Sequence, residues 1–186
     1  MGDRNGKGGS TYDTAPIHAT RHRPQKLGGF GRATQARLLV LASCCLTGCA
    51  DVTRVVSGMA LGWDLALAHA AVLTGIPFTA AVPCDAQESR WPPSSQAYYR
   101  RLLALSDDVV VVSPGGYEPW KMQARNEWMV DQCDLLLALW DGSRGGKANC
   151  CWYAQRIERP IENLWREWTR LNDSDSALAS GDRVVG

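Results

Sequence analysis

The chain has 186 residues, a length that fits one domain able to bury its own hydrophobic core. Its twenty Lys and Arg residues nearly balance its nineteen Asp and Glu residues, for a formal net charge of +1. This balance argues against a protein whose main task is to coat nucleic acid or an anionic membrane. The apolar stretches are shorter than the ~20 residues of a membrane span, and the seven cysteines follow no metal-ligand spacing. We therefore expect a soluble, cytoplasmic protein with reduced thiols and no metal.

The two ends of the chain differ in composition from the part between them. Residues 1–14 and 171–186 are poor in large apolar groups, and we predict that both are disordered tails. Residues 15–170 are predicted to form one domain. Within it, short apolar runs predict strands at 16–20, 54–57, 78–82, 108–113, 134–140 and 160–164. Helical patterns lie between these runs at 32–47, 63–74, 94–105, 121–131 and 147–157.

The alternation of strands and helices predicts the fold. Parallel neighbouring strands need right-handed helical crossovers, which place helices on both faces of a sheet. We therefore expect a Rossmann-like three-layer αβα sandwich with a mostly parallel sheet. Ligands of such sheets bind beyond the carboxyl ends of the strands, so the loops that leave each strand are the candidate sites.

The loop after the first predicted strand, TRHRP at residues 20–24, joins cationic side chains to a rigid proline. Arg23 is a candidate clamp for an anionic group. His22 lies between two arginines, which disfavour its protonated form. Its functional interpretation is therefore a neutral hydrogen-bonding role, and the alternative is an ordinary turn residue.

The loop SGMALGWD, at residues 57–64, runs from a predicted strand through Gly58, Met59 and Gly62 into an alanine-rich helix. Glycines in such a turn leave backbone N–H groups uncovered at the positive end of the helix, where proteins bind phosphate. A plain tight turn is the alternative. Asp64 falls in the first helical turn. It either complements the helix dipole or serves as a carboxylate that holds a ribose hydroxyl or positions water.

A similar pattern recurs in LLLALWDGSRGGKANC, at residues 135–150. Asp141 follows an apolar strand, and Gly145 and Gly146 open the next helix. Two strand-to-helix glycine turns in one sheet favour an anion site. Lys147 would add positive charge there, and Asn149 is either a helix cap or a ligand contact.

The segment KMQARNEWMVD, at residues 121–131, has the pattern of an amphipathic helix. Arg125 lies near its start. From the sequence alone, Arg125 is either a solvated salt-bridge partner or a ligand clamp.

Six segments in order resemble the SLOG superfamily, and within it the branch with a domain of unknown function typified by the bacterial protein YpsA. They are ATRHRPQKLGG, SGMALGWD, QESRWPPSSQAYY, KMQARNEWMVD, LLALWDGSRGGKANC and YAQRIERPIENLW. The resemblance implies a Rossmann-like fold related to the lysine decarboxylase-like LOG hydrolases and to the DNA-uptake protein DprA. It also implies a pocket for nucleotides or nucleotide-derived molecules, and a homodimer, since the family's relatives often pair.

The chain departs from the family pattern at two positions. The opening motif of the family usually reads Thr-Gly-His-Arg-Pro, and here Thr20, His22 and Arg23 match it while Arg21 replaces the glycine. The Cβ of Arg21 stands where a backbone could have approached a ligand closely. In the later loop, Lys147 replaces a threonine, exchanging a hydroxyl for a charge.

Two functions remain open at this point. The leading hypothesis is a module that binds or senses a nucleoside phosphate or an ADP-ribose-like molecule. The alternative is a nucleotide N-glycosidase, because Arg125 resembles the arginine of the LOG hydrolases, although the glutamate of their glycine loop is missing here. Asp64 or Asp141 would have to replace that acid. No GxGxxG fingerprint occurs, so we expect no cofactor, and the predicted ligand contacts are Thr20, His22, Arg23, Gly58, Met59, Gly62, Gly145, Gly146, Lys147 and Asn149.

Overall fold

The structure is a computed structural model that describes residues 16–20, 27, 29, 31–49, 51–144 and 146–181, and side chains at 27, 29, 31–49, 51–144 and 148–173. Six strands form one sheet in the order β4-β3-β2-β1-β5-β6, and every pairing between neighbours is parallel. The strands are β1 (Pro16–Thr20), β2 (Arg54–Ser57), β3 (Phe78–Val82), β4 (Asp108–Val111), β5 (Leu135–Ala138) and β6 (Ile161–Asn163).

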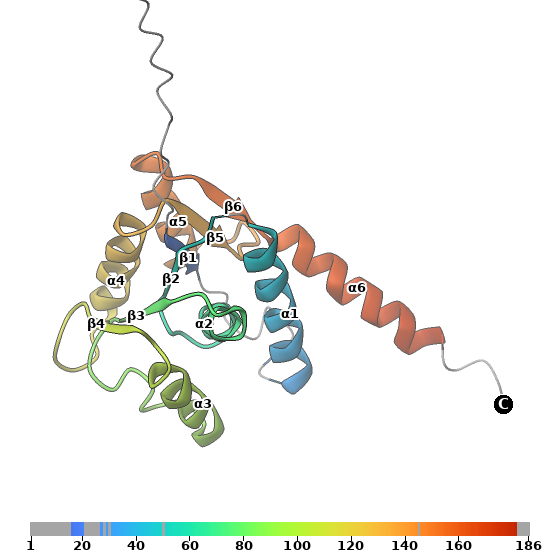
Figure 1. Ribbon diagram of the computed structural model, residues 1–186, viewed down its shortest axis with the longest axis horizontal. Coiled ribbons are helices and arrows are strands. Elements are labelled where there is room, and N and C mark those ends of the chain that lie inside the picture. Colours follow the sequence, from blue (N-terminus) through green and yellow to red (C-terminus); the bar gives the residue numbers. More distant parts are fainter. Residues whose placement is uncertain are drawn as a thin grey trace, which may run out of the picture.

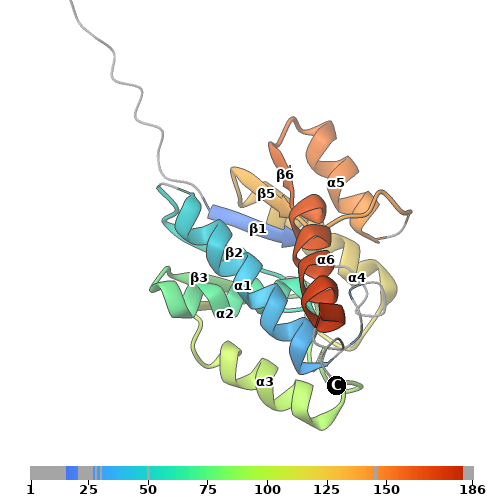
Figure 2. The same ribbon diagram turned by 90° about the vertical axis from the view of Figure 1, so that its right-hand side faces the viewer.

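Helices connect the strands and cover both faces of the sheet. They are α1 (Arg32–Gly48), α2 (Trp63–Thr74), α3 (Pro93–Leu103), α4 (Pro119–Asp131), α5 (Gly146–Arg156) and α6 (Trp165–Gly181). Figures 1 and 2 show α1, α2 and α3 on one face and α4 and α5 on the other. The predicted three-layer αβα sandwich with a parallel sheet is confirmed, although β4, β5 and β6 are shorter than predicted.

The main core lies between the sheet and the layer of α1 and α2. Helix α2 is apolar on most of its surface because the sheet, α1 and α3 surround it. Its alanines, Ala66, Ala68, Ala70 and Ala71, are at most 5% exposed, and their small side chains let the neighbouring elements pack closely. The indole of Trp63, at the start of α2, donates a hydrogen bond of 3.1 Å to the carbonyl of Leu137 in β5.

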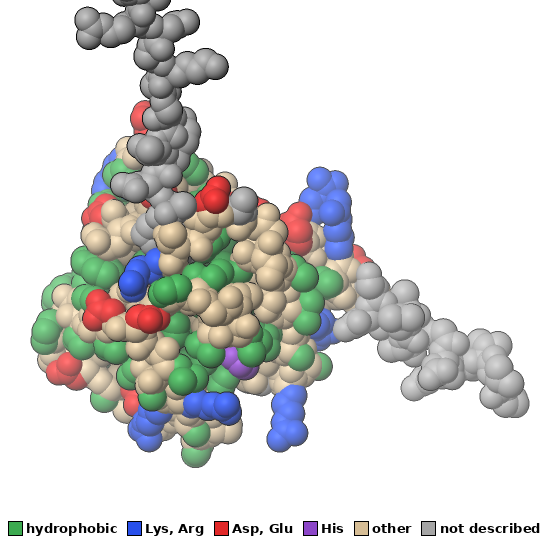
Figure 3. Space-filling model, in the orientation of Figure 1, with side chains coloured by type: hydrophobic (Ala, Val, Ile, Leu, Met, Phe, Trp, Pro, Cys, Tyr) green, Lys and Arg blue, Asp and Glu red, His purple; other side chains and the backbone are tan. Residues whose placement is uncertain are grey.

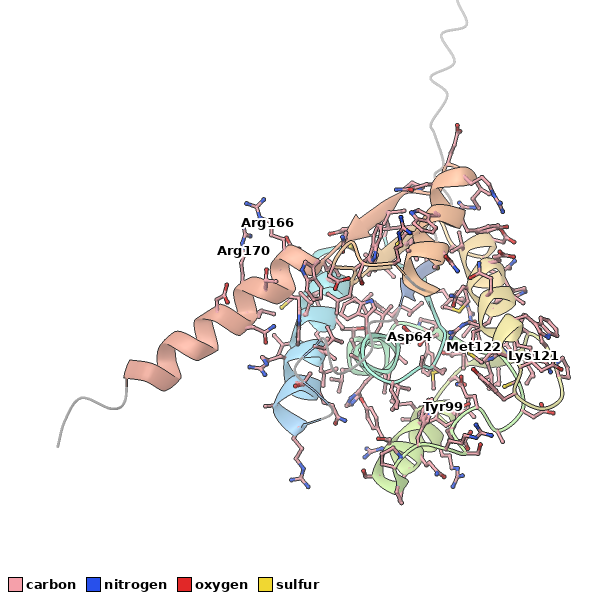
Figure 4. All side chains as sticks on the ribbon, turned by 180° about the vertical axis from the view of Figure 1, so that it is seen from behind. Asp64, Tyr99, Lys121, Met122, Arg166 and Arg170 are labelled. Carbon is pink, nitrogen blue, oxygen red and sulfur yellow. The ribbon has the colours of Figure 1, made fainter. Side chains whose placement is uncertain are left out.

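Helix α6 was not among the predicted elements. It begins at Trp165 and continues to Gly181, so it runs eleven residues into the segment that was predicted to be a disordered tail. Trp168 is 1% exposed and belongs to the main core, and Trp165 and Leu171 pack against that core. Figure 4 shows Arg166 and Arg170 on α6 pointing away from the rest of the domain. Within the described part of the chain, no helix is long and apolar enough to cross a membrane.

Candidate functional site

The strand order places the predicted loops along one edge of the sheet. The chain runs from β1 through β2 and β3 to β4 in one direction, and β5 then lies on the other side of β1. The order therefore reverses beside β1, which is where ligands bind in open parallel sheets. Thr20 is the last residue of β1 and pairs with Ala138 at the end of β5.

Several of the predicted contacts have no described side chain. His22, Arg23 and Gly145 lie outside the described residues. Gly146 and Lys147 form the first turn of α5, and only their backbone is described. Their roles stay predictions.

The β2–α2 turn is buried and internally hydrogen-bonded. The N–H of Met59 donates to Ser57 Oγ (3.2 Å), and the N–H of Ala60 lies 3.4 Å from Asp64 Oδ2. Ser57 Oγ in turn donates to the carbonyl of Asp64 at 2.8 Å. The amide of Met59, a predicted ligand contact, and that of Ala60 thus donate to side chains of the same turn.

The backbone of this turn is unusual at two positions. Met59 has a φ of 55°, a left-handed conformation that costs a residue with a Cβ about 1–3 kcal/mol. Gly62 has a φ of 96° and a ψ of −121°, a conformation that residues with a Cβ rarely adopt. Gly62 precedes α2, and no side chain caps the helix there.

Arg125 reaches this turn from α4. Its Nη1 donates a hydrogen bond to the carbonyl of Gly58 and lies 3.6 Å from Oδ2 of Asp64. Arg125 is 4% exposed and Asp64 is 1% exposed, so the ion pair is buried. A Cβ on Gly58 would collide with Nη1 of Arg125 and lie 2.7 Å from Oδ2 of Asp64. The glycine is therefore required for the approach of Arg125.

The structure thus brings the predicted residue Arg125 to two other predicted residues, Gly58 and Asp64, from which it is far apart in the chain. Of the two interpretations of Arg125, the salt bridge is present, although it is buried rather than solvated, and the ligand clamp stays a prediction. The helix-dipole interpretation of Asp64 is incomplete, since its carboxylate also pairs with the cation.

Lys121 is a residue of this site that the sequence analysis did not select. It lies one turn before Arg125 on the same face of α4 and is only 5% exposed. Its Nζ donates to the carbonyl of Pro114 at 2.7 Å, and no carboxylate of the described residues forms an ion pair with it. Figure 4 shows Lys121 and Met122 on α4 and Asp64 on α2. The signal that could have found Lys121 was its spacing of four residues from Arg125.

Two thiols lie within electrostatic range of Arg125. Burial raises the pKa of the Cys84 thiol, and the Lys121 ammonium partly opposes that shift. Burial also raises the pKa of the Cys150 thiol well above its usual range. Both thiols are therefore neutral at physiological pH, and the charges of this region come from Lys121, Arg125, Asp64 and Asp85. Among the described residues, no cluster of His, Cys, Asp and Glu could hold a metal ion.

The β5–α5 turn lies on the other side of β1 and is more open. Oδ1 of Asp141 accepts hydrogen bonds from the N–H of Ser143 at 3.0 Å and from its Oγ at 2.5 Å. The indole of Trp140 donates to the carbonyl of Ser143 at 2.8 Å. Gly142 has a φ of 82°, and Asn149 is exposed on α5. Asp141 therefore shapes its own loop, and its predicted catalytic role stays a prediction.

Residues 50–162 match the model of the YpsA family, described as the YspA SLOG family. The chain belongs to this family. The match covers the β2–α2 turn, Arg125 and Asp141, and it begins after the opening TRHRP motif. The resemblance predicted from the sequence is thus confirmed.

Individual relatives of this YpsA-family chain agree with the family match. The chain is 31% identical over 129 residues to the uncharacterized SPbeta prophage-derived protein YoqJ of Bacillus subtilis. This match covers 61% of this chain and 75% of the relative. It is 26% identical over 88 residues to a UPF0398 protein of Bacillus thuringiensis, covering 47% of this chain and 48% of the relative.

Solved structures of DNA processing protein A (DprA) share the fold. The protein from Streptococcus pneumoniae superposes with a TM-score of 0.58 at 17% identity, over 78% of this chain and 48% of that one. The protein from Helicobacter pylori was solved in a study of its single-stranded DNA binding mode. It superposes with a TM-score of 0.57 at 16% identity, over 80% of this chain and 64% of that one. The YpsA-family chain thus spans about half the length of the UPF0398 protein and of the S. pneumoniae DprA.

Proposed function

We propose that this YpsA-family domain binds a nucleotide-derived small molecule, a nucleoside phosphate or an ADP-ribose-like compound, at the carboxyl edge of its sheet. The observation that carries the proposal is the convergence of Arg125 and Lys121 on the β2–α2 turn beside the reversal in strand order. Two cations on one helix face, with one buried carboxylate between α4 and α2, favour an anionic ligand.

The anion would not bind to the amides of Met59 and Ala60, because Ser57 and Asp64 already accept from them. The predicted contacts that remain for it belong to the loops that follow β1, β2 and β5 in the sequence: Thr20, His22, Arg23, Gly62, Gly145, Gly146, Lys147 and Asn149. Figure 3 shows acidic and basic side chains interspersed on one face of the domain. Two buried cations on a nearly neutral chain suit a small anion better than a long polyanion.

The test is a thermal-shift screen of the purified chain with nucleoside monophosphates, ADP-ribose and NAD. We expect at least one compound to raise the melting temperature in a saturable manner. The Arg125→Lys variant keeps the charge but loses the planar guanidinium, and should weaken that response. Arg101→Ala, which removes an exposed arginine in the last turn of α3, is the matched control and should respond like the parent chain. If no compound shifts the parent chain, the proposal is wrong.

A second candidate is N-glycoside hydrolysis, which the pairing of Asp64 with Arg125 favours. Hydrolysis needs a carboxylate that activates water or stabilises the oxocarbenium-like transition state. Here Arg125 holds the carboxylate of Asp64 in a defined position. Free base release, followed by chromatography in the same screen, decides between the two. If the domain is a hydrolase, Asp64→Asn should abolish release while the thermal shift persists. If a compound stabilises the parent chain but no base is released, the domain binds the compound without hydrolysing it.

The likeness to DprA suggests one more ligand for the same screen. A fluorescent single-stranded oligonucleotide, followed by anisotropy, tests whether this domain shares the binding named for the H. pylori protein. With a formal charge of +1, we expect no saturable binding at 150 mM salt, about the physiological ionic strength. Tight oligonucleotide binding that a mononucleotide cannot displace would contradict the small-molecule proposal.

A further inference from the structure

The two edges of the sheet differ in composition. Strand β6, at one edge, ends with the polar residues Glu162 and Asn163, and the Asn163 side chain bonds the backbone N–H and carbonyl of Trp140 at 3.0 and 2.8 Å. Strand β4 lies at the other edge, and the last three of its four residues are valines. Within the described part of the chain, β4 pairs with β3 alone. Its outer side therefore presents backbone groups that no second strand pairs, beside apolar side chains.

The faces of β4 are exposed as well. In an all-parallel sheet, helices normally cover both faces of the strands, and all five residues of the neighbouring β3 are buried. Around β4, by contrast, none of the sixteen residues from Leu105 to Trp120 is buried. Helix α4 packs over β1 and β3, and α3 packs against α2. Figure 1 shows β4 at one margin of the domain, where the loop to α4 projects outward.

Large apolar side chains gather in this segment. Nine large hydrophobic residues of the described chain are exposed, and five of them lie here, each between 37% and 60% exposed. They are Leu105, Val109, Val111, Tyr117 and Trp120, which we call the β4 patch. Val109 and Val111 lie on the same face of the strand, because side chains alternate along it. Such a concentration of exposed apolar surface is typical of a protein–protein contact.

We propose that the β4 patch joins two copies of this chain, with their β4 strands paired antiparallel across a two-fold axis. A surface on a two-fold axis must be complementary to itself. A run of valines meets this condition, because each valine packs against a valine of the partner. The pairing also gives the outer backbone groups of β4 their hydrogen-bond partners and joins two six-stranded sheets into one. The inference does not depend on the ligand of the proposed function.

The charges near β4 favour the antiparallel orientation. Asp107 and Asp108 lie together where the strand begins, and they accept hydrogen bonds from the N–H groups of Phe78 and Val109, both at 2.8 Å. Like charges on directly opposite residues destabilise a pair of strands. Parallel pairing of two β4 strands would set the acidic starts side by side, whereas antiparallel pairing places them at opposite ends of the interface.

The size of the exposed segment predicts a modest affinity. Stable interfaces use ~20–30 residues of each partner, and this segment supplies at most sixteen. We therefore expect a dimer that forms and dissociates reversibly in the micromolar range.

The test measures the molecular mass of the full chain by sedimentation velocity over a concentration series. We expect the mass to rise from that of one chain toward that of two. In a register centred on Val110, Val109 lies opposite the partner's Val111. Val109→Lys combined with Val111→Lys then sets like charges opposite each other, and should raise the dissociation constant of the dimer at least about tenfold.

Two further variants sharpen this measurement. Val109→Lys combined with Val111→Glu sets opposite charges across the interface, so it should weaken the dimer less than the two-lysine variant does. Leu73→Lys changes a leucine of α2 that is 62% exposed and lies outside the β4 patch, and this control should dimerise like the parent chain. Circular dichroism confirms that each variant is folded.

Hydrogen exchange of the parent chain locates the interface independently. With rising protein concentration, the backbone amides of β4 should exchange more slowly, and those of β6 at the other edge should not change.

Three results would overturn the inference. The first is a parent chain that stays monomeric throughout the series. The second is a folded two-lysine variant that dimerises as tightly as the parent chain, because another surface would then join the copies. The third is a variant with lysine and glutamate that dissociates as readily as the two-lysine variant, because the strands would then not be antiparallel in this register.

Discussion

The two glycine turns at the carboxyl edge have the same sequence pattern, a strand followed by glycines and a helix, but different structures. In the β2–α2 turn, Ser57 through Leu61 are all buried, and side chains accept from the amides of Met59 and Ala60. In the β5–α5 turn, Gly142 and Arg144 are exposed, and Asp141 holds the loop through Ser143.

The difference shows that a glycine pattern alone does not predict an open anion site. In the first turn, the absence of a Cβ at Gly58 makes room for a protein cation rather than for a ligand. In the second turn, the left-handed Gly142 serves the loop backbone and has nothing within 4 Å of its Cβ position. We infer that the first turn is a rigid support for Arg125 and that the second turn is the solvent-exposed part of the site.

The largest effect should come from Arg125→Ala. The variant leaves the carboxylate of Asp64 buried without its cation, which should lower the free energy of unfolding by about 3–5 kcal/mol. Urea denaturation followed by circular dichroism measures the loss. The control is Arg144→Ala, whose side chain is exposed in the other turn and whose removal should leave the urea midpoint unchanged. Equal midpoints for the two variants would contradict the contrast between the turns.

Much of the fold could be predicted from the sequence because short buried strands and helical patterns are local signals. Helix α6 was missed for a local reason as well. The segment after Leu171 contains mostly small and polar residues, which resemble a tail. Most of the large apolar residues of α6, namely Trp165, Trp168 and Leu171, lie before that segment. Their spacing of three residues is helical and could have signalled the start of α6.

The candidate site was predictable only in parts. Asp64 and Arg125 were each selected from their local motifs, but their ion pair depends on the order of the strands, which brings α4 back over β2. Local patterns carry no information about that order. The occupation of the Met59 and Ala60 amides was also beyond the sequence, because it depends on side-chain positions within a tight turn.

A smaller effect is expected for Gly58→Ala, which tests how closely Arg125 packs on the first turn. The added Cβ would displace the guanidinium from the carbonyl of Gly58, and such overpacking costs about 1–3 kcal/mol. If the cost comes from this collision, it should largely disappear in a background that already carries Arg125→Ala.

The matched control for this cycle is Gly142→Ala in the second turn. Its cost should come from a φ of 82° rather than from a collision, at about 1–2 kcal/mol. That cost should therefore be the same with or without Arg125. A Gly58→Ala penalty that survives the loss of Arg125 undiminished would show that the guanidinium does not cause it, and the contact of the added Cβ with Oδ2 of Asp64 would then account for the cost.

The smallest effect should come from Asp141→Ala in the second turn. The variant loses two hydrogen bonds to Ser143, but the N–H and hydroxyl of Ser143 are partly open to water. We therefore expect the free energy of unfolding to fall by only about 1 kcal/mol. Ser143→Ala removes the hydroxyl bond alone and keeps the backbone N–H bond, so it should cost less. Thermal unfolding of the two variants beside the parent chain measures both. A loss for Asp141→Ala as large as that for Arg125→Ala would mean that the second turn supports the fold as rigidly as the first, and Asp141 would then be structural rather than a candidate for the chemistry.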